Sequence, residues 1–129
     1  MRRTKSLRKL KRPGSAVVGI DLAGVKTHET GFCTLGEEWK AKTRILHTDE
    51  EIAAATIENS PRLVCIDAPL GLPKGRCCLR DDCACRSVGH LRECDRELLR
   101  RRIKFFPVTL GPMRKLTIRG ILLRKRFEN

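Results

Sequence analysis

Two apolar runs that end in aspartate, Ala16-Val-Val-Gly-Ile-Asp21 and Leu63-Val-Cys-Ile-Asp67-Ala-Pro69, decide how this chain is expected to fold. Each run is typical of a buried strand in a sheet that is covered on both faces. If the two strands are neighbours, Asp21 and Asp67 meet at one edge of that sheet. Two carboxylates about 4 Å apart repel by roughly 4 kcal/mol at an effective dielectric constant of about 20, so they either share a proton or hold a cation. A divalent metal held by paired aspartates suggests phosphate chemistry.

The two aspartates also have a simpler interpretation. An aspartate at the end of a strand is often a turn former or the cap of a following helix. This alternative is stronger for Asp67, because Asp67-Ala-Pro69 begins a turn. Against it, buried carboxylates are rare without partners, and here two matching runs each carry one.

The predicted elements of the first half form a meander and a crossover. Strands over residues 17–22, 28–35 and 38–46 are joined by short turns, which suggests antiparallel pairing. Thr48-Asp-Glu-Glu51 is a capping box that starts a helix reaching residue 59. The strand at residues 63–67 then returns parallel to the first strand.

The second half is predicted to be a loop followed by two helices. Residues 68–89 form an irregular loop, and a loop of that length is usually functional or held by a ligand. A helix follows over residues 91–104, and residues 105–112 are non-helical because of Pro107 and Gly111-Pro112. The last helix covers residues 113–126. Its apolar face consists of Met113, Leu116, Gly120, Leu123 and Phe127. Gly120 on that face suggests close backbone packing, and the whole order predicts an α/β fold with a mixed sheet.

Length and charge limit the class of protein. The 129 residues suit one domain, and 28 Lys and Arg against 15 Asp and Glu give a net charge of +13. Such a surplus favours nucleic acid as a partner over an anionic membrane. No apolar run approaches the roughly 20 residues of a membrane-spanning helix, and no signal peptide is recognisable, so we expect a cytoplasmic protein without a membrane partner. We expect residues 1–14 to be a disordered basic arm that lies on phosphates or is simply solvated, and residues 15–129 to be the domain.

Seven cysteines are many for this length, and their number is odd. Because nothing marks secretion, reduced thiols are expected rather than a disulfide framework. The loop holds Cys77-Cys78-x4-Cys83-x-Cys85, which supplies the four ligands of a tetrahedral zinc site, although the spacing is not a paired CxxC knuckle. Free thiols or a redox pair are the alternative. Cys33 and Cys65 alternate into strands and are expected in the core.

Basic residues recur at every fourth position of the helix predicted over residues 91–104. They are Arg92, Arg96, Arg100 and Lys104. Such a stripe lies on one helix face and can follow a phosphate backbone. The alternative is a solvated face supported by local pairs, for example Glu97 with Arg101.

Four sequence blocks are similar to a known family. They are Gly19-Ile-Asp21-Leu-Ala23, Ile66-Asp67-Ala-Pro69-Leu-Gly-Leu-Pro73, Arg92-Glu-Cys-Asp95 and Phe106-Pro-Val-Thr-Leu-Gly-Pro-Met113-Arg-Lys-Leu116-Thr-Ile-Arg119-Gly120. The order of elements resembles the ribonuclease-H-like fold, and the blocks resemble domain of unknown function family 429. Members of that family are described as predicted ribonuclease-H-like nucleases. The resemblance covers roughly residues 17–123.

The resemblance implies a sheet whose strand-end carboxylates bind two divalent metals, Mg²⁺ or Mn²⁺, for phosphodiester hydrolysis. Asp21 and Asp67 fall on the positions of the metal ligands, and Glu50 or Glu51 is a candidate third ligand. Such folds normally continue with a fifth strand and a helix that carries another acidic residue. We therefore expect a C-terminally truncated member, a fragment or a partner-dependent form, in which Asp95 or Glu97 substitutes as a catalytic residue. The candidate substrate-binding residues are Arg92, Arg96, Arg100, Lys104, Arg114 and Arg119.

Three functions are therefore compatible with the sequence. The leading hypothesis is a metal-dependent nuclease acting on RNA or DNA. The second is a non-catalytic nucleic-acid-binding module of the same fold. The third is an actin-like nucleotide-binding phosphotransferase, which also opens with a Gly-Ile-Asp strand, although no Gly-rich phosphate loop is present.

Overall fold

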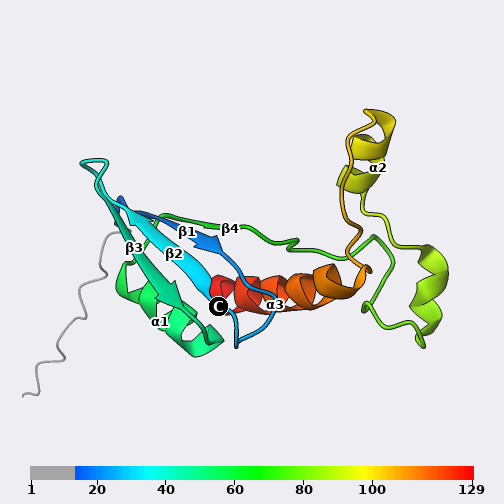
Figure 1. Cartoon of the computed structure of the whole chain (residues 1–129), viewed down its shortest axis with the longest axis horizontal. Coiled ribbons are helices and arrows are strands. Elements are labelled where there is room, and N and C mark those ends of the chain that lie inside the picture. The colour runs from blue at the N-terminus through cyan, green and yellow to red at the C-terminus, as the bar shows by residue number, and fades with distance from the viewer. Residues whose placement is uncertain (1–13) are drawn as a thin grey trace, which may run out of the picture.

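The computed structural model describes residues 14–129, and Figure 1 shows a β-sheet from which a long helix leads to an outlying helical region. Apart from Gly14, the predicted basic arm lies outside the described residues. The Gly14 N–H donates to the Ser60 carbonyl at 3.0 Å, which joins the start of the described chain to the end of the first helix.

The sheet of residues 14–129 has the strand order β3-β2-β1-β4. Its strands are β1 (Val17–Asp21), β2 (Thr30–Leu35), β3 (Ala41–Leu46) and β4 (Leu63–Ile66). β2 is antiparallel to both β1 and β3, whereas β4 is parallel to β1. The prediction of a mixed sheet in an α/β fold, with an antiparallel meander and a parallel fourth strand, is confirmed.

Three α-helices and a short 3₁₀ helix complete the described chain. They are α1 (Asp49–Glu58), η1 (Ala84–Val88), α2 (Glu93–Arg100) and α3 (Gly111–Glu128). The predicted capping box of α1 is confirmed, because the Thr48 hydroxyl accepts from the Glu51 N–H and the Glu51 carboxylate accepts from the Thr48 N–H. None of the helices in residues 14–129 combines the length and hydropathy needed to cross a membrane.

The hydrophobic core lies between one face of the sheet and the helices α1 and α3. Val18 and Phe32 from the strands are fully or almost fully buried, and they pack in one cluster with Ile52 of α1 and Leu123 of α3. Leu116 and Phe127 pack against the same cluster, which confirms the apolar face predicted for α3.

The other face of the sheet is open. The prediction that the two aspartate-ended strands are covered on both faces is wrong, and Cys65 is exposed rather than in the core. Leu63 on the same side of β4 is also exposed. The apolar run of β4 is misleading because successive side chains point to opposite faces, and only one of those faces meets the helices.

The helix predicted over residues 91–104 is shorter, because α2 ends at Arg100. The Arg102 N–H donates to the Leu99 carbonyl and the Ile103 N–H to the Leu98 carbonyl, both at 2.9 Å. These two bonds form a Schellman motif, in which Arg102 takes the left-handed conformation with a φ of 58°. Lys104 therefore does not continue the basic stripe of the helix.

The last helix begins earlier than predicted. α3 starts at Gly111 with Pro112 in its first turn, where a missing N–H costs nothing. The predicted close packing at Gly120 is confirmed, because an added Cβ would lie 2.9 Å from the Pro69 carbonyl oxygen and 3.0 Å from the Ala68 Cβ.

Candidate functional site

Asp21 and Asp67 lie side by side at the carboxyl ends of two parallel strands. Asp21 is the last residue of β1, and Asp67 directly follows β4. The register pairs Ile20 with Ile66, and the Asp67 N–H donates to the Ile20 carbonyl at 2.8 Å. Because neighbouring strands are about 4.8 Å apart, the next residues along, Asp21 and Asp67, are adjacent across the sheet.

Both aspartates line one shallow cavity of about 570 Å³ on the open face of the sheet. Gly19 and Gly31 line the same cavity. No other atom lies within 4 Å of the point where a Gly19 Cβ would be, and a Gly31 Cβ would lie 3.4 Å from the Asp21 Cβ. Larger side chains at these two positions would therefore fill the space beside the carboxylates.

Asp21 and Asp67 differ from the other aspartates in having no cationic partner among residues 14–129. All six aspartates of the chain lie within residues 14–129. Four of them pair with arginine: Asp49 with Arg119, Asp81 with Arg114, Asp82 with Arg80, and Asp95 with Arg92. Within the described residues, the carboxylates of Asp21 and Asp67 have neither a hydrogen bond nor an ion pair. Their oxygens are free to accept a ligand.

The donor set of this pair fits one hydrated divalent cation. Mg²⁺ is commonly held through one or two carboxylates, with water and substrate phosphate completing its coordination. No third Cys, His, Asp or Glu side chain of residues 14–129 joins the pair in a metal-binding cluster. The Glu51 carboxylate already accepts hydrogen bonds from the backbone N–H groups of Thr48 and His47, and these bonds lower its pKa. Glu50 lies 3.7 Å from Arg126.

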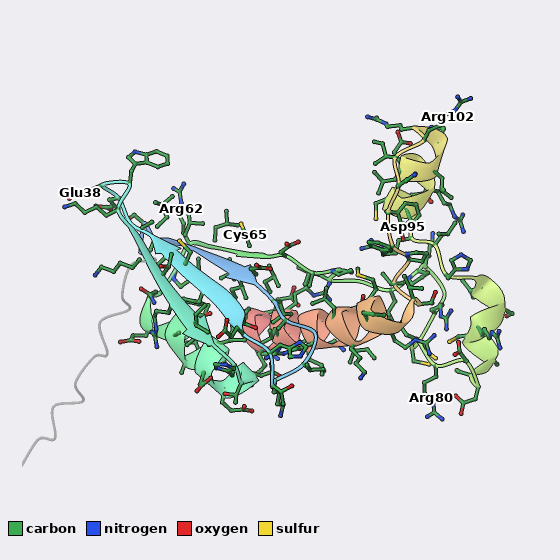
Figure 2. The ribbon with its side chains drawn as sticks, viewed as in Figure 1. Glu38, Arg62, Cys65, Arg80, Asp95 and Arg102 are labelled. Carbon is green, nitrogen blue, oxygen red and sulfur yellow. The ribbon has the colours of Figure 1, made fainter. Side chains whose placement is uncertain are left out.

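The structure does not bring Asp95 to this pair. Asp95 is the third residue of α2, which lies apart from the sheet (Figure 2). Its carboxylate is fully buried and accepts from the Arg92 N–H at 2.9 Å and from the Arg92 guanidinium at 2.9 and 3.0 Å. Burial acts to raise the pKa of Asp95, but the hydrogen bonds from Arg92 outweigh it and leave the pKa lowered. The geometry gives Asp95 a capping role in place of the predicted catalytic one.

The candidate substrate-binding residues divide into paired and unpaired groups. Arg119 is only 6% exposed, and Arg114 donates to both carboxylate oxygens of Asp81, so both guanidinium groups are already used within the fold. Arg92 pairs with Asp95, and Arg100 pairs with Glu97. The remaining two, Arg96 and Lys104, are exposed and have no ion-pair partner within residues 14–129.

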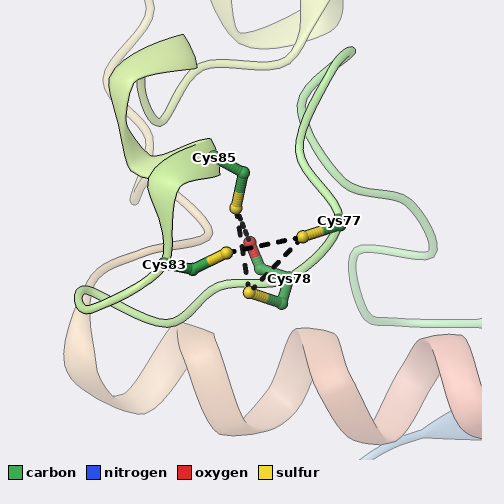
Figure 3. Close-up of side chains that lie close together, drawn as sticks. All are labelled: Cys77, Cys78, Cys83 and Cys85. Atoms are coloured by element: carbon green, nitrogen blue, oxygen red, sulfur yellow. Dashed lines mark hydrogen bonds between the residues drawn. The ribbon is translucent and has the colours of Figure 1, made fainter.

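The four loop cysteines form a second cluster, as Figure 3 shows. The sulfur atoms of Cys77, Cys78, Cys83 and Cys85 all lie within 4.8 Å of one another, an arrangement that could hold a metal ion. A hydrogen bond with Cys83 raises the pKa of the Cys77 thiol to about 12, whereas hydrogen bonding to the backbone of Cys78 lowers the pKa of Cys85 to about 6. Without a cation, the crowded sulfurs therefore cannot all be thiolates at neutral pH.

Sequence reasoning missed the two glycines beside the aspartates. Gly31 of β2 pairs with Asp21 of β1, and Gly19 lies two residues before Asp21 on the same strand. Both glycines line the cavity, but neither was predicted from the sequence as part of the site. A signal was present, because glycine inside a strand often marks the close approach of a ligand or another backbone. Another cavity, of about 700 Å³, is lined by His90, Leu91, Leu99 and residues 102–107. Its lining is mostly apolar and has no carboxylate, so we place the candidate site at the aspartates.

The fold and this site define an α/β protein with paired carboxylates at the ends of adjacent parallel strands. The family described as "Protein of unknown function (DUF429)" matches residues 19–118. The chain belongs to this family, and the matched segment contains both aspartates and the four clustered cysteines. No curated protein and no solved structure shows a significant match to the chain.

Proposed function

We propose that this protein is a metal-dependent nuclease of the ribonuclease-H-like type, which hydrolyses phosphodiester bonds in RNA or DNA. The observation that carries the proposal is the adjacency of Asp21 and Asp67, the two aspartates that no arginine of the described residues neutralises. Unpaired carboxylates side by side repel each other, and a divalent cation removes that cost.

In this proposal Asp21 and Asp67 hold Mg²⁺ or Mn²⁺, which supplies an activated water and stabilises the leaving oxygen. The open sheet face lets an extended polyanion reach the carboxylates from solvent. Gly19 and Gly31 allow its backbone to approach the strands closely, because neither has a side chain. Arg96 and Lys104, which have no ion-pair partner within the described part of the chain, bind phosphates farther along the nucleic acid.

The proposal is tested by a nuclease assay on RNA and DNA with Mg²⁺, with Mn²⁺ and with a chelator. We expect cleavage by the wild-type chain that requires the metal. Asp21→Asn and Asp67→Asn keep the shape of the side chain and remove its charge. Each is expected to lower the cleavage rate by about 100-fold or more, because even changes outside the first coordination shell cost 10–100-fold in metal sites.

A matched control is Glu58→Gln, which also replaces one exposed carboxylate by an amide. Glu58 is the last residue of α1, on the covered side of the sheet. We expect its cleavage rate to equal that of the wild type. Unchanged cleavage in both aspartate variants would rule the proposed active site out.

A second candidate is a nucleic-acid-binding module without catalysis. The observation in its favour is that only two carboxylates meet at the sheet edge, with no third acidic ligand among residues 14–129. This function predicts binding that weakens with salt, no turnover with any metal, and an affinity that Asp21→Asn and Asp67→Asn leave intact or increase.

A further inference from the structure

Three of the six sulfur–sulfur distances in the cysteine cluster match those of a tetrahedral zinc site, and the other three are no longer than 4.8 Å. The Cys77 and Cys83 sulfurs are 3.6 Å apart, those of Cys78 and Cys85 are 3.7 Å apart, and those of Cys77 and Cys78 are 3.9 Å apart. A zinc ion bonded to four sulfurs at about 2.3 Å requires sulfur–sulfur distances of about 3.8 Å. The observed distances agree with that value within about 0.2 Å.

The same distances exclude disulfide bonds between these cysteines. The sulfurs of a disulfide are about 2.05 Å apart, and all seven cysteines of the chain are free. Figure 3 shows the four side chains converging on one point from two segments, with Cys77 and Cys78 on one and Cys83 and Cys85 on the other. Cys83 caps the 3₁₀ helix η1, and Cys85 lies within it.

The surrounding loop holds these two segments together through Arg76. The Arg76 side chain is buried and donates to the carbonyls of Cys78, Arg80 and Gly89, at 2.9, 3.1 and 2.9 Å. Gly89 has a φ of 101°, a conformation that favours glycine. The guanidinium therefore joins the two ends of the segment that carries the cysteines.

A further contact attaches this loop to α3. Arg114 donates to both carboxylate oxygens of Asp81 at 3.1 Å, and Asp81 lies between the two cysteine pairs. Leu79, between the same pairs, is almost fully buried. The loop thus has a defined position on the helix, and the cysteine sulfurs are held in place by the chain around them.

We propose that Cys77, Cys78, Cys83 and Cys85 bind one Zn²⁺ in a closed tetrahedral site that fixes the 76–89 loop against α3. Each zinc–sulfur bond replaces a sulfur–hydrogen bond, and the proton passes to the buffer. Four protein ligands leave no open position for water or substrate, so the ion is structural. In the same loop, Arg76 and Arg86 have no ion-pair partner within residues 14–129 and offer positive charge to the resulting negative centre, whereas Arg80 pairs with Asp82.

Elemental analysis of the purified full chain is the first test. We expect one zinc per chain that remains after dialysis against a weak chelator. Cys83→Ser combined with Cys85→Ser is expected to bring the zinc content close to zero. Cys65→Ser combined with Cys94→Ser is the matched control, because it removes two exposed cysteines outside the cluster and should retain one zinc.

Two measurements on the wild-type chain keep the test independent of how the serine variants fold. Co²⁺ in place of zinc should give the visible absorption bands of a tetrahedral thiolate site. Removal of zinc should increase tryptic cleavage after Arg80 and Arg86 about tenfold through local opening of the loop, with cleavage after Arg62 unchanged.

A wild-type chain that takes up neither zinc nor cobalt, or that holds iron, would overturn the assignment. Unchanged tryptic cleavage after zinc removal would overturn the structural role. The inference is independent of the nuclease proposal, because Asp21→Asn and Asp67→Asn should retain zinc whether or not they affect cleavage.

Discussion

At the scale of single residues, burial separates arginines that hold the fold from arginines that are free to bind a ligand. Arg119 donates to Asp49 at 2.7 Å and to the carbonyls of Ala23 and His47 at 2.6 Å. It thereby ties α3 to the end of β1 and to the start of α1. The sequence does not distinguish Arg119 from the exposed Arg96, because both are arginines within a predicted helix.

The Asp95–Arg92 pair predicts a pH-dependent stability of α2. Burial acts to raise the pKa of Asp95, yet the hydrogen bonds from Arg92 lower it overall. A carboxylate with a lowered pKa stabilises the folded state fully above its unfolded pKa, and the contribution is lost as the pH falls through the folded value. We expect Asp95→Asn to lower the free energy of opening of α2 by about 2 kcal/mol at neutral pH, the usual contribution of hydrogen bonds to a charged group.

Amide hydrogen exchange of α2 at neutral and acidic pH measures this effect. The difference between the wild type and Asp95→Asn should shrink as the pH falls, because the wild-type carboxylate is then protonated. Asp82→Asn, which removes an exposed carboxylate paired with Arg80, should leave the protection of α2 nearly unchanged. An equal loss of protection at both pH values would contradict the assigned role of Asp95.

At the scale of elements, the backbone conformation at single residues decides where α2 ends and where α3 begins. The spacing of basic residues predicted a helix to residue 104, but the helix ends before Arg102, which has a left-handed conformation. The sequence shows no sign of this end, because the residue that usually takes this conformation is glycine. No helix is predicted before residue 113 because of Gly111-Pro112, whereas a proline in the first turn is compatible with a helix. Gly120, by contrast, was predicted correctly as a point of close packing, because glycine inside a helix needs such a reason.

We expect Gly120→Ala to destabilise the protein although alanine is the better helix former. The gain in helix propensity is about 1 kcal/mol, but the new Cβ would lie 2.9 Å from the Pro69 carbonyl oxygen, and overpacking costs about 1–3 kcal/mol. Urea denaturation should show a free energy of unfolding lowered by about 1 kcal/mol. Gly71→Ala is the control, because nothing lies within 4 Å of its added Cβ; a Gly120→Ala variant as stable as this control would disprove the contact.

At the scale of the whole molecule, the candidate substrate-binding cations without an ion-pair partner in residues 14–129 lie on or just after α2, apart from Asp21 and Asp67 at the sheet. Figure 2 shows α2, with Arg102 at its tip, projecting away from the sheet, while Arg62 lies at the sheet. Among the candidate substrate-binding residues, those without an ion-pair partner in residues 14–129 are Arg96 and Lys104. A nucleic acid bound by this protein is therefore expected to contact the region of α2 as well as the sheet.

The salt dependence of binding tests this expectation. Arg96→Ala combined with Lys104→Ala should weaken binding to single-stranded RNA, and it should reduce the slope of log K against log salt by roughly 0.7 per lost phosphate contact. Fluorescence anisotropy at several KCl concentrations gives both quantities. Lys42→Ala combined with Arg62→Ala removes the same charge at the other end of the molecule; an equal reduction in that variant would show that binding is not localised at α2.

Local patterns were sufficient to predict the antiparallel meander, the capping box of α1 and the apolar face of α3, because each depends on residues close together in the chain. The parallel return of β4 pairs Val17 with Leu63, which are far apart in the chain, and it was predicted from the general rule for a helical crossover. The sequence also predicts that Asp21 and Asp67 meet at one sheet edge if their strands are neighbours, and the structure pairs β1 with β4. Only the tertiary structure decided that one sheet face is open, that Asp95 caps α2 and that Arg119 is buried. The partner of a charged side chain is set by contacts that the local sequence does not contain, as between Asp49 and Arg119, which are 70 positions apart.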